Sequence, residues 1–240
     1  MTATLIGVGV GPGDPEHLTL KALRALREAN RVVAPTAAID AVGRAESIVR
    51  QAAPEIKIDR IPFTMAPGAA ARAATARAAA GQLLTWLDDG ERVAFITLGD
   101  PNVYSTFSAI AAEVRVARPS IPIETVAGIM AFQDLAARAG IVLLDDRETL
   151  TLVTGLDGPE AAAVALKDPA RAVVVYKGGK HVSAIAKALS DAGRLDGAVL
   201  GELLGLPGER LAPLADVCDQ PASYLATIVI PPAPETRDGR

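Results

Sequence analysis

The sequence predicts an α/β protein built from two domains, residues 1–118 and 119–240. Three observations support this class. Strand-like apolar runs alternate with helical patterns along the chain, as in domains whose helices cover a sheet. The run RVAFITLGDP, residues 92–101, is almost continuously apolar, which is typical of a parallel strand buried on both faces. Aromatic residues make up only 3% of the chain, so Ala, Val, Leu and Ile must build the core.

The elements of the first half follow from apolar periodicity and its punctuation by glycine and proline. Leu20, Leu23 and Leu26 form one apolar stripe of a helix for which Thr19 is a candidate N-cap. Gly90 ends a long alanine-rich helix. The predicted strands are residues 4–10, 31–35, 56–63 and 92–101, and the predicted helices are 18–30, 43–54, 69–90 and 105–117.

The second half continues the same alternation after Pro119 and Pro122, which mark the linker. We find no internal repeat. The last residues, 233–240, are expected to fray. The predicted strands are 121–126, 148–154, 171–177, 197–203 and 223–232, and the predicted helices are 130–139, 159–167 and 181–192.

Charge and cysteine usage exclude several classes of protein. The formal net charge is −4, which argues against a nucleic-acid binder but allows clustered arginines to bind an acidic small molecule. Cys218 is the single cysteine, so an intrachain disulfide is excluded and a reducing compartment fits. No basic leader precedes the first strand, and no run approaches the roughly 20 apolar residues of a membrane span. We therefore expect a cytoplasmic protein.

The stretch GVGVGPGDPEH, residues 7–17, allows two interpretations. Glycines at alternate positions leave one face of a strand bare, so a ligand or another backbone can approach closely. Alternatively the strand runs into a Gly-Pro turn, with Asp14 as a helix N-cap and Pro15 at the first helical position. The dinucleotide-binding pattern is missing, because its third glycine would fall on Pro12 or Asp14.

In open α/β sheets, ligands bind beyond the carboxyl ends of the strands. In the second candidate loop, Gly99 lets the backbone approach a ligand, and Asp100 supplies a carboxylate. Tyr104, Ser105 and Thr106 bring hydroxyls to a helix start, although Asp100 or Ser105 would serve equally well as a cap. Three loops qualify on this basis: Gly9 to Asp14, Leu98 to Ser105, and Ala127 to Ala131.

The remaining polar residues suggest little chemistry. His17 and His181 lie in different halves and lack the clustered cysteines or carboxylates of a metal site, so no metal is expected. Lys177 and Lys180 would suit an anion, but such a pair also fits a solvated loop.

Six stretches in fixed order resemble one known family. The first half contains GVGVGPGDPEHLTLKALRALREAN and AFITLGDPNVYSTF, and the second half contains ETVAGIMAFQDLAARAG, VVVYKGGKHV, LGELLGLPGERL and SYLATIVI. Over about the whole chain they resemble the tetrapyrrole methylases, a family of S-adenosylmethionine-dependent enzymes. The ending Tyr-Ser-Thr-Phe is similar to that of the branch acting on C-20 of precorrin-2.

The resemblance implies a parallel-sheet N-terminal domain and a mixed-sheet C-terminal domain with a cleft between them, and a homodimer. It also implies that main-chain groups bind much of the cofactor, S-adenosylmethionine. The implied cofactor residues are Pro12, Leu98, Gly99, Asp100, Val103, Tyr104, Ser105, Thr106, Gly128, Met130, Ala131, Tyr176, Lys177, Leu204 and Ala222. The implied substrate residues are Gly9, Gly11, Gly13, Asp14, Arg44 and Arg60, with Arg138 and Arg147 as further candidates for the substrate carboxylates.

Two departures from the family pattern concern turns near the site. Ala127 stands where a proline is expected before Gly128, which loosens the turn but keeps the glycine. The usual Pro-Met-Thr appears as PFTM, residues 62–65, so Thr64 and Met65 stand in changed order and substrate contacts there are left open.

The resemblance implies methylation of precorrin-2 at C-20, giving precorrin-3A on the route to cobalamin. Asp100 or water is the expected acceptor of the C-20 proton. The alternatives are cobalt-factor II of the anaerobic pathway, uroporphyrinogen III or another tetrapyrrole as methyl acceptor. Methylation of RNA or protein, a non-catalytic tetrapyrrole-binding protein and a nicotinamide oxidoreductase are more distant interpretations.

Overall fold

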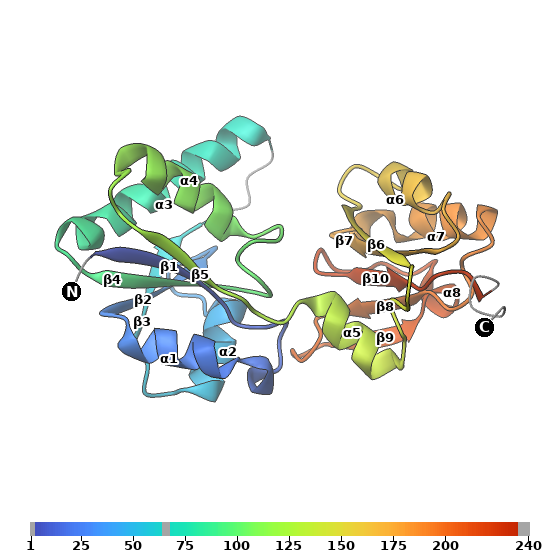
Figure 1. The fold of residues 1–240 in the computed structure, drawn as a ribbon, viewed down its shortest axis with the longest axis horizontal. Helices are drawn as coiled ribbons and strands as arrows, with labels where there is room; N and C mark the ends of the chain where they lie inside the picture. Colours follow the sequence, from blue (N-terminus) through green and yellow to red (C-terminus); the bar gives the residue numbers. More distant parts are fainter. Residues whose placement is uncertain (1–2, 64–67, 235–240) are drawn as a thin grey trace. The chain divides into compact units, whose positions relative to one another are not determined.

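The computed structural model describes residues 3–63 and 68–234, which form two compact units (Figure 1). One unit extends up to Met130 and the other begins at Ala131. The predicted departure at Thr64 and Met65 and most of the predicted frayed tail lie outside the described residues.

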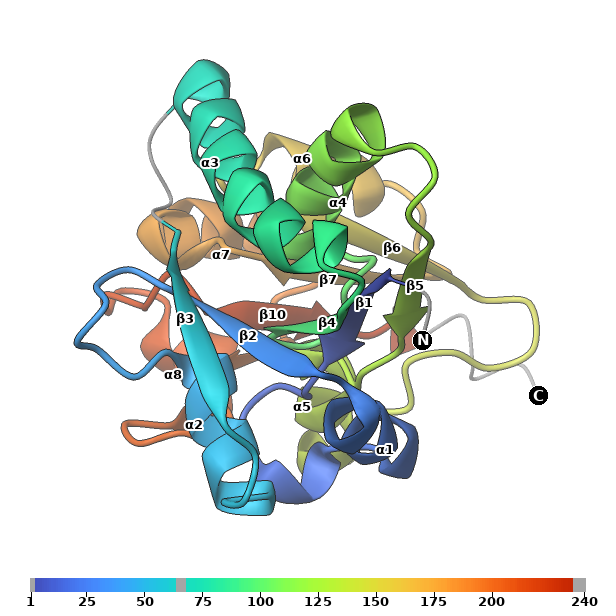
Figure 2. The same cartoon turned by 90° about the vertical axis from the view of Figure 1, so that its left-hand side faces the viewer.

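The first unit contains a parallel sheet covered by helices on both faces. Its strands lie in the order β3-β2-β4-β1-β5, and every neighbouring pair is parallel. The helices α1 and α2 pack on one face, and α3 and α4 on the other (Figure 2). The elements are β1 Thr4–Gly9, η1 Pro15–His17, α1 Leu20–Glu28, β2 Arg31–Thr36, α2 Arg44–Ala52, β3 Ile58–Pro62, α3 Ala69–Asp88, β4 Arg92–Thr97, α4 Thr106–Ala117 and β5 Ile123–Val126.

The observed boundary between the units differs from the predicted one at residue 118. The strand predicted at 121–126 was assigned to the second domain, whereas β5 pairs in parallel with β1, Leu5 lying opposite Ile123. Because that pairing completes the first sheet, β5 belongs to the first unit. Pro119 and Pro122 therefore flank a connection within this unit.

The core of the first unit explains why β1 is apolar on both faces. Leu5 packs with α3 and α4, whereas Ile6 and Val8 pack with α1 and α2. A Cβ atom at Gly7 would overlap the ring of Phe107 on α4. The bare position at Gly7 is therefore filled by a side chain of the same unit.

The carboxyl ends of β1, β4 and β5 approach one another closely, because Gly9 and Gly128 both lie against the carbonyl oxygen of Gly99. A Cβ atom at Gly9 would lie 2.7 Å from the nitrogen of Gly128 and would overlap the carbonyl oxygen of Gly99. A Cβ atom at Gly128 would overlap the same oxygen and lie 2.8 Å from the carbonyl carbon of Gly9. We call this arrangement of Gly9, Gly99 and Gly128 the three-glycine contact. It is a backbone-to-backbone approach that no side chain would permit.

The second unit contains a mixed sheet in the order β6-β7-β10-β8-β9. The pair β6 and β7 is parallel, and the other pairs are antiparallel. The helices α6 and α7 pack on the apolar face formed by residues such as Val173 and Val175. The elements are α5 Ala131–Ala139, β6 Thr149–Thr154, α6 Glu160–Ala165, β7 Arg171–Tyr176, η2 Gly179–His181, α7 Val182–Asp191, β8 Val199–Glu202, β9 Arg210–Pro213, α8 Leu214–Val217 and β10 Thr227–Ile230.

Neither β9 nor α8 was predicted from the sequence, and β10 is shorter than the strand predicted at 223–232. The strand β9 has only four residues, ends at Pro213 and lies at the sheet edge, so it has neither the length nor the alternation of a recognisable strand. It is defined by its pairing with β8, in which Glu202 lies opposite Arg210.

The three-glycine contact predicts opposite effects for two glycine-to-alanine substitutions. Gly128→Ala introduces a Cβ atom against backbone and should lower the free energy of unfolding by roughly 1–3 kcal/mol, the range found for overpacking. Gly81→Ala, inside α3 with open space around the new atom, should raise it by about 0.5–1 kcal/mol. Urea unfolding of both variants and the unmodified chain measures these differences. Equal stabilities for G128A and the unmodified chain would contradict the close approach.

Candidate functional site

The carboxyl ends of β1 and β4 form a topological switch point. These strands are neighbours in the sheet, but β1 leads to α1 on one face and β4 leads to α4 on the other (Figure 2). The following loops therefore diverge and leave a crevice beyond the strand ends, which is the usual ligand site of open α/β sheets. Two of the three loops singled out in the sequence flank this point.

Main-chain hydrogen bonds join the two loops at the switch point. The Gly99 N–H donates to the carbonyl oxygen of Gly11 at 2.8 Å, and the Val10 N–H donates to Thr97 at 3.0 Å. Gly99 has φ +64°, and its absent Cβ would point into open space. The backbone of Gly99 is therefore uncovered on that side, as a ligand bound by main-chain groups requires.

Asp100 braces the loop after β4 against the loop after β5. One carboxylate oxygen accepts the Gly128 N–H at 3.1 Å, and the other accepts the Asn102 N–H at 2.8 Å. The Asn102 amide also donates to the Thr125 hydroxyl at 3.3 Å. Asp100 thus holds the loop after β5 beside the loop after β4. Its carboxylate lies at the strand ends, as we expected from the sequence.

The residues after Asp100 form a strained turn and a helix cap. Tyr104 has φ +49°, an unusual conformation for a bulky residue, and its side chain is 46% exposed. The Ser105 hydroxyl accepts the Phe107 N–H at 3.0 Å and lies 3.0 Å from the Thr97 hydroxyl. The capping interpretation of Ser105 is therefore confirmed.

The glycine-rich loop after β1 combines both interpretations offered for it. Asp14 caps η1, because its carboxylate accepts the Glu16 N–H at 2.8 Å. Thr19 caps α1 in the same way, accepting the Ala22 N–H at 3.0 Å. Gly9 is explained by the approach of another backbone, so its assignment to the substrate is not required by the structure.

Four of the predicted residues of the second unit, Tyr176, Lys177, Leu204 and Ala222, gather at one end of its sheet. Tyr176 ends β7 and Leu204 follows β8, and both strands run antiparallel to β10, whose first residue Thr227 lies opposite Tyr176. Ala222 precedes β10, and its carbonyl oxygen lies against Gly179, where a Cβ atom would be 2.7 Å away. The chain therefore brings three separate blocks of the sequence together.

Backbone geometry at this end of the sheet is also unusual. Lys177 and Leu203 both have positive φ, +60° and +53°, at the ends of β7 and β8. The Phe132 N–H at the start of α5 donates to the Tyr176 hydroxyl at 3.3 Å. Leu204 is buried as a whole residue.

Glu202, which was not predicted as a site residue, organises this end of the sheet. Its carboxylate is mostly buried, accepts the Ser223 N–H at 3.2 Å and pairs with Arg210. In the sequence, the sign of its role is a carboxylate at the end of an otherwise apolar strand. Its partners could not be read from the sequence, because they come from β9 and from the loop before β10.

The four candidate arginines divide into two groups. Arg60 pairs with Glu46 on α2, and Arg138 pairs with Glu209. Arg138 and the Gly205 N–H lower the pKa of Glu209 to about 2, so that pair stays ionised at neutral pH. Arg44 and Arg147 are exposed and have no ion pair among the described residues.

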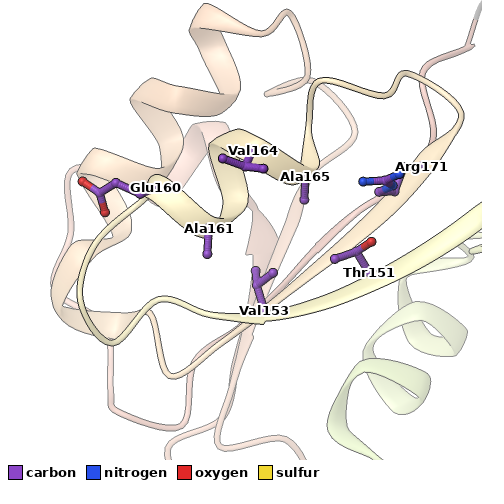
Figure 3. Close-up of a pocket in the computed structure, with 7 residues that line it drawn as sticks. All are labelled: Thr151, Val153, Glu160, Ala161, Val164, Ala165 and Arg171. Atoms are coloured by element: carbon purple, nitrogen blue, oxygen red, sulfur yellow. The ribbon is translucent and has the colours of Figure 1, made fainter.

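Features elsewhere in the described chain do not add to this site. The described residues contain no cluster of three metal-ligating side chains, and no described helix is long and apolar enough to span a membrane. A shallow hollow of about 520 Å³ lies between α6 and β6, with Val153 and Val164 on its wall and Glu160 and Arg171 toward its ends (Figure 3). None of the predicted site residues lines it.

Comparison with known proteins extends these observations to the whole chain. The family model described as Tetrapyrrole (Corrin/Porphyrin) Methylases matches residues 4–217. A precorrin-2 C(20)-methyltransferase from Sinorhizobium sp is 31% identical, covering 95% of this chain and 94% of the relative. A cobalt-precorrin-2 C(20)-methyltransferase from Salmonella typhimurium is 29% identical, covering 96% and 97%. The structure of uroporphyrin-III C-methyl transferase from Thermus thermophilus, complexed with S-adenyl homocysteine, matches with a TM-score of 0.66, 23% identity and coverage of 98% and 99%.

The fold thus defines an α/β protein with a parallel sheet, a topological switch point and an uncovered glycine backbone beyond its strand ends. More particularly, the chain belongs to the tetrapyrrole methylase family.

Proposed function

We propose that this protein transfers a methyl group from S-adenosylmethionine to C-20 of precorrin-2, giving precorrin-3A. The observation that carries this proposal is the 31% identity to a precorrin-2 C(20)-methyltransferase over almost the full length of both chains. The Tyr-Ser-Thr-Phe ending of the loop after β4 agrees with it.

The proposed cofactor contacts are those of the loops described above. The open side of Gly99 and the neighbouring main chain from Leu98 to Ser105 suit a ligand bound by backbone groups. When bound, S-adenosylmethionine supplies a methyl group whose bond to sulfur breaks with the electron pair staying on sulfur, while a carbon–carbon bond forms at C-20. The full proposed set is Pro12, Leu98, Gly99, Asp100, Val103, Tyr104, Ser105, Thr106, Gly128, Met130, Ala131, Tyr176, Lys177, Leu204 and Ala222.

The protein's contribution to this reaction is chiefly positional. An enamine-like meso carbon needs little activation toward a sulfonium methyl, and well-oriented reactants gain up to roughly 7–11 kcal/mol from proximity. The three-glycine contact and the two hydrogen bonds to Asp100 keep the loops in one geometry. After transfer, C-20 must lose one proton, and we propose Asp100 as its acceptor.

The first test is an oxygen-free incubation with S-adenosylmethionine and either precorrin-2 or cobalt-factor II, followed by mass spectrometry. We expect a gain of one methyl group on precorrin-2. Methylation of the cobalt form alone would reverse the assignment to the anaerobic substrate, a second candidate supported by the 29% identical Salmonella relative. Methylation of neither, together with no affinity for S-adenosylhomocysteine, would favour a non-catalytic binding protein.

The second test concerns the proton acceptor. Asp100→Asn keeps one oxygen that can accept the Gly128 N–H but removes the basic carboxylate. We expect kcat to fall roughly 100-fold or more, the usual contribution of a general base, and the pH–rate profile to lose one limb. Because Asp100 also belongs to the proposed cofactor contacts, the assay uses saturating S-adenosylmethionine, and calorimetric binding of S-adenosylhomocysteine reports any loss of cofactor affinity separately. A pH–rate profile indifferent to this substitution would reject Asp100 and leave water as the acceptor.

We also propose that the protein is a homodimer in the cytoplasm, as the family resemblance implies. Sedimentation velocity of the purified chain should give about twice the mass of one chain. A monomer at micromolar concentration would contradict the homodimer.

A further inference from the structure

The turn that connects β8 to β9, residues 203–209, has an unusual backbone. Leu203, Gly205 and Gly208 all have positive φ, at +53°, +69° and +86°. Glycine adopts such angles readily, whereas leucine does so at a cost in free energy, because its Cβ atom crowds the following carbonyl oxygen. Strain of this kind persists only where surrounding contacts impose it. We call residues 203–209 the β8–β9 turn.

Strained backbone in the described chain gathers near the proposed cofactor contacts. Four described residues other than glycine have positive φ, namely Tyr104, Asp146, Lys177 and Leu203. Tyr104 and Lys177 belong to the proposed cofactor set, and Leu203 directly precedes another member, Leu204. Strained backbone clusters at ligand sites, where it fixes a geometry before the ligand binds. Leu203 is therefore placed where its conformation affects a proposed ligand contact.

Glu209 closes the β8–β9 turn from its far end. Its Oε2 atom accepts the Gly205 N–H at 2.6 Å and Nη1 of Arg138 at 2.8 Å, and its Oε1 atom pairs with Nη2 of Arg138. Inside the turn, the Leu206 N–H donates to the carbonyl oxygen of Leu203 at 2.8 Å. The carboxylate thus connects the middle of the turn to α5, which carries Arg138.

The helix α5 gives this ion pair a rigid support. A Cβ atom at Gly201 in β8 would lie 2.8 Å from Cδ1 of Leu135 on α5 and 3.0 Å from Cδ2 of Leu204, so both side chains pack directly on β8. Arg138 follows Leu135 by three residues, and its Nη1 atom also lies 3.7 Å from the Asp134 carboxylate on the same helix. The guanidinium therefore reaches the turn from a helix that already packs against the same strand.

We infer that the Arg138–Glu209 ion pair is a clamp that holds Leu203 in its strained conformation and so pre-forms the turn that carries Leu204 for S-adenosylmethionine. Arg138 and Glu209 are positioning residues, since they act through the turn. Apparent affinity falls with the fraction of the protein in the binding conformation, so a turn held in advance binds more tightly. Arg138, a candidate for the substrate carboxylates in the sequence, is assigned here to the turn. The inference rests on the proposed function, since it explains how the same cofactor is bound.

The experiment measures binding of S-adenosylhomocysteine to the full chain by isothermal titration calorimetry. Glu209→Ala removes both the ion pair and the acceptor of the Gly205 N–H. We expect the dissociation constant to rise about tenfold, because a leucine released from the left-handed conformation leaves it most of the time.

Asp88→Ala is the matched control. Asp88 lies at the end of α3 and accepts two hydrogen bonds from Arg118, each 2.9 Å long, in an ion pair of the first unit. This pair has the same two-pronged geometry as the clamp, but it holds no turn of the proposed cofactor set. Its loss should leave the dissociation constant unchanged.

A second substitution tests whether the clamp acts through Leu203. Glycine adopts positive φ without strain, so Leu203→Gly removes the need for the clamp. In the L203G background, Glu209→Ala should weaken binding no more than about twofold, because the two effects share one cause. Leu206→Gly is the control, since Leu206 lies in the same turn but does not have a positive φ, and it should leave the full effect of Glu209→Ala in place.

Urea unfolding of every variant accompanies the titrations. A purely stabilising ion pair would lower the free energy of unfolding on removal and leave the dissociation constant of the folded protein unchanged. The clamp instead predicts a change in the dissociation constant that L203G suppresses and L206G does not.

The outcomes separate this inference from the proposed function. If the unmodified chain binds S-adenosylhomocysteine and methylates precorrin-2 but E209A binds like D88A, the inference is overturned and the proposed function stands. Equal losses from Glu209→Ala in the unmodified, L206G and L203G backgrounds would also overturn it, because the ion pair would then not act through Leu203. If the unmodified chain neither binds S-adenosylhomocysteine nor methylates a tetrapyrrole, the proposed function fails and the inference fails with it.

Discussion

The close approach of three strand ends is the constraint on which the rest of the first unit depends. Gly9, Gly99 and Gly128 come from β1, β4 and β5, which are far apart in the chain, yet their backbones meet without any side chain between them. Asp100 adds a hydrogen bond across the same contact. Because the loops that diverge from this point carry the proposed ligand contacts, a shift of any one strand end would move them all.

This constraint explains why the site has few reactive side chains. A parallel sheet with helices on both faces buries its central strands, here β1, β2 and β4, so a ligand is expected at the loops beyond their carboxyl ends. Those loops are rich in glycine, and their polar groups largely bond to one another, as Asp14, Ser105 and Thr19 do in capping helices. The groups that stay available for the proposed ligand are mainly backbone, which suits a reaction that depends strongly on orientation.

Arginines that pair with carboxylates of their own unit are not free to bind the carboxylates of a ligand. Arg60 satisfies the buried carboxylate of Glu46, a group whose burial without partners would be costly. Arg138 is engaged by Glu209 within the second unit. Arg44 has no such partner among the described residues, so its charge is available to a ligand.

The sequence by itself determined the succession of helices and strands, the parallel character of the first sheet and the family. These properties depend on local periodicity, on glycine and proline, and on motifs that stay contiguous in the chain. Only the tertiary structure decided the strand order, the place of β5 in the first sheet, the existence of β9 and the partners of Gly9 and Arg60. These are contacts between residues distant in the sequence. Neither spacing nor composition predicts which strand end or carboxylate a given residue contacts in the folded chain.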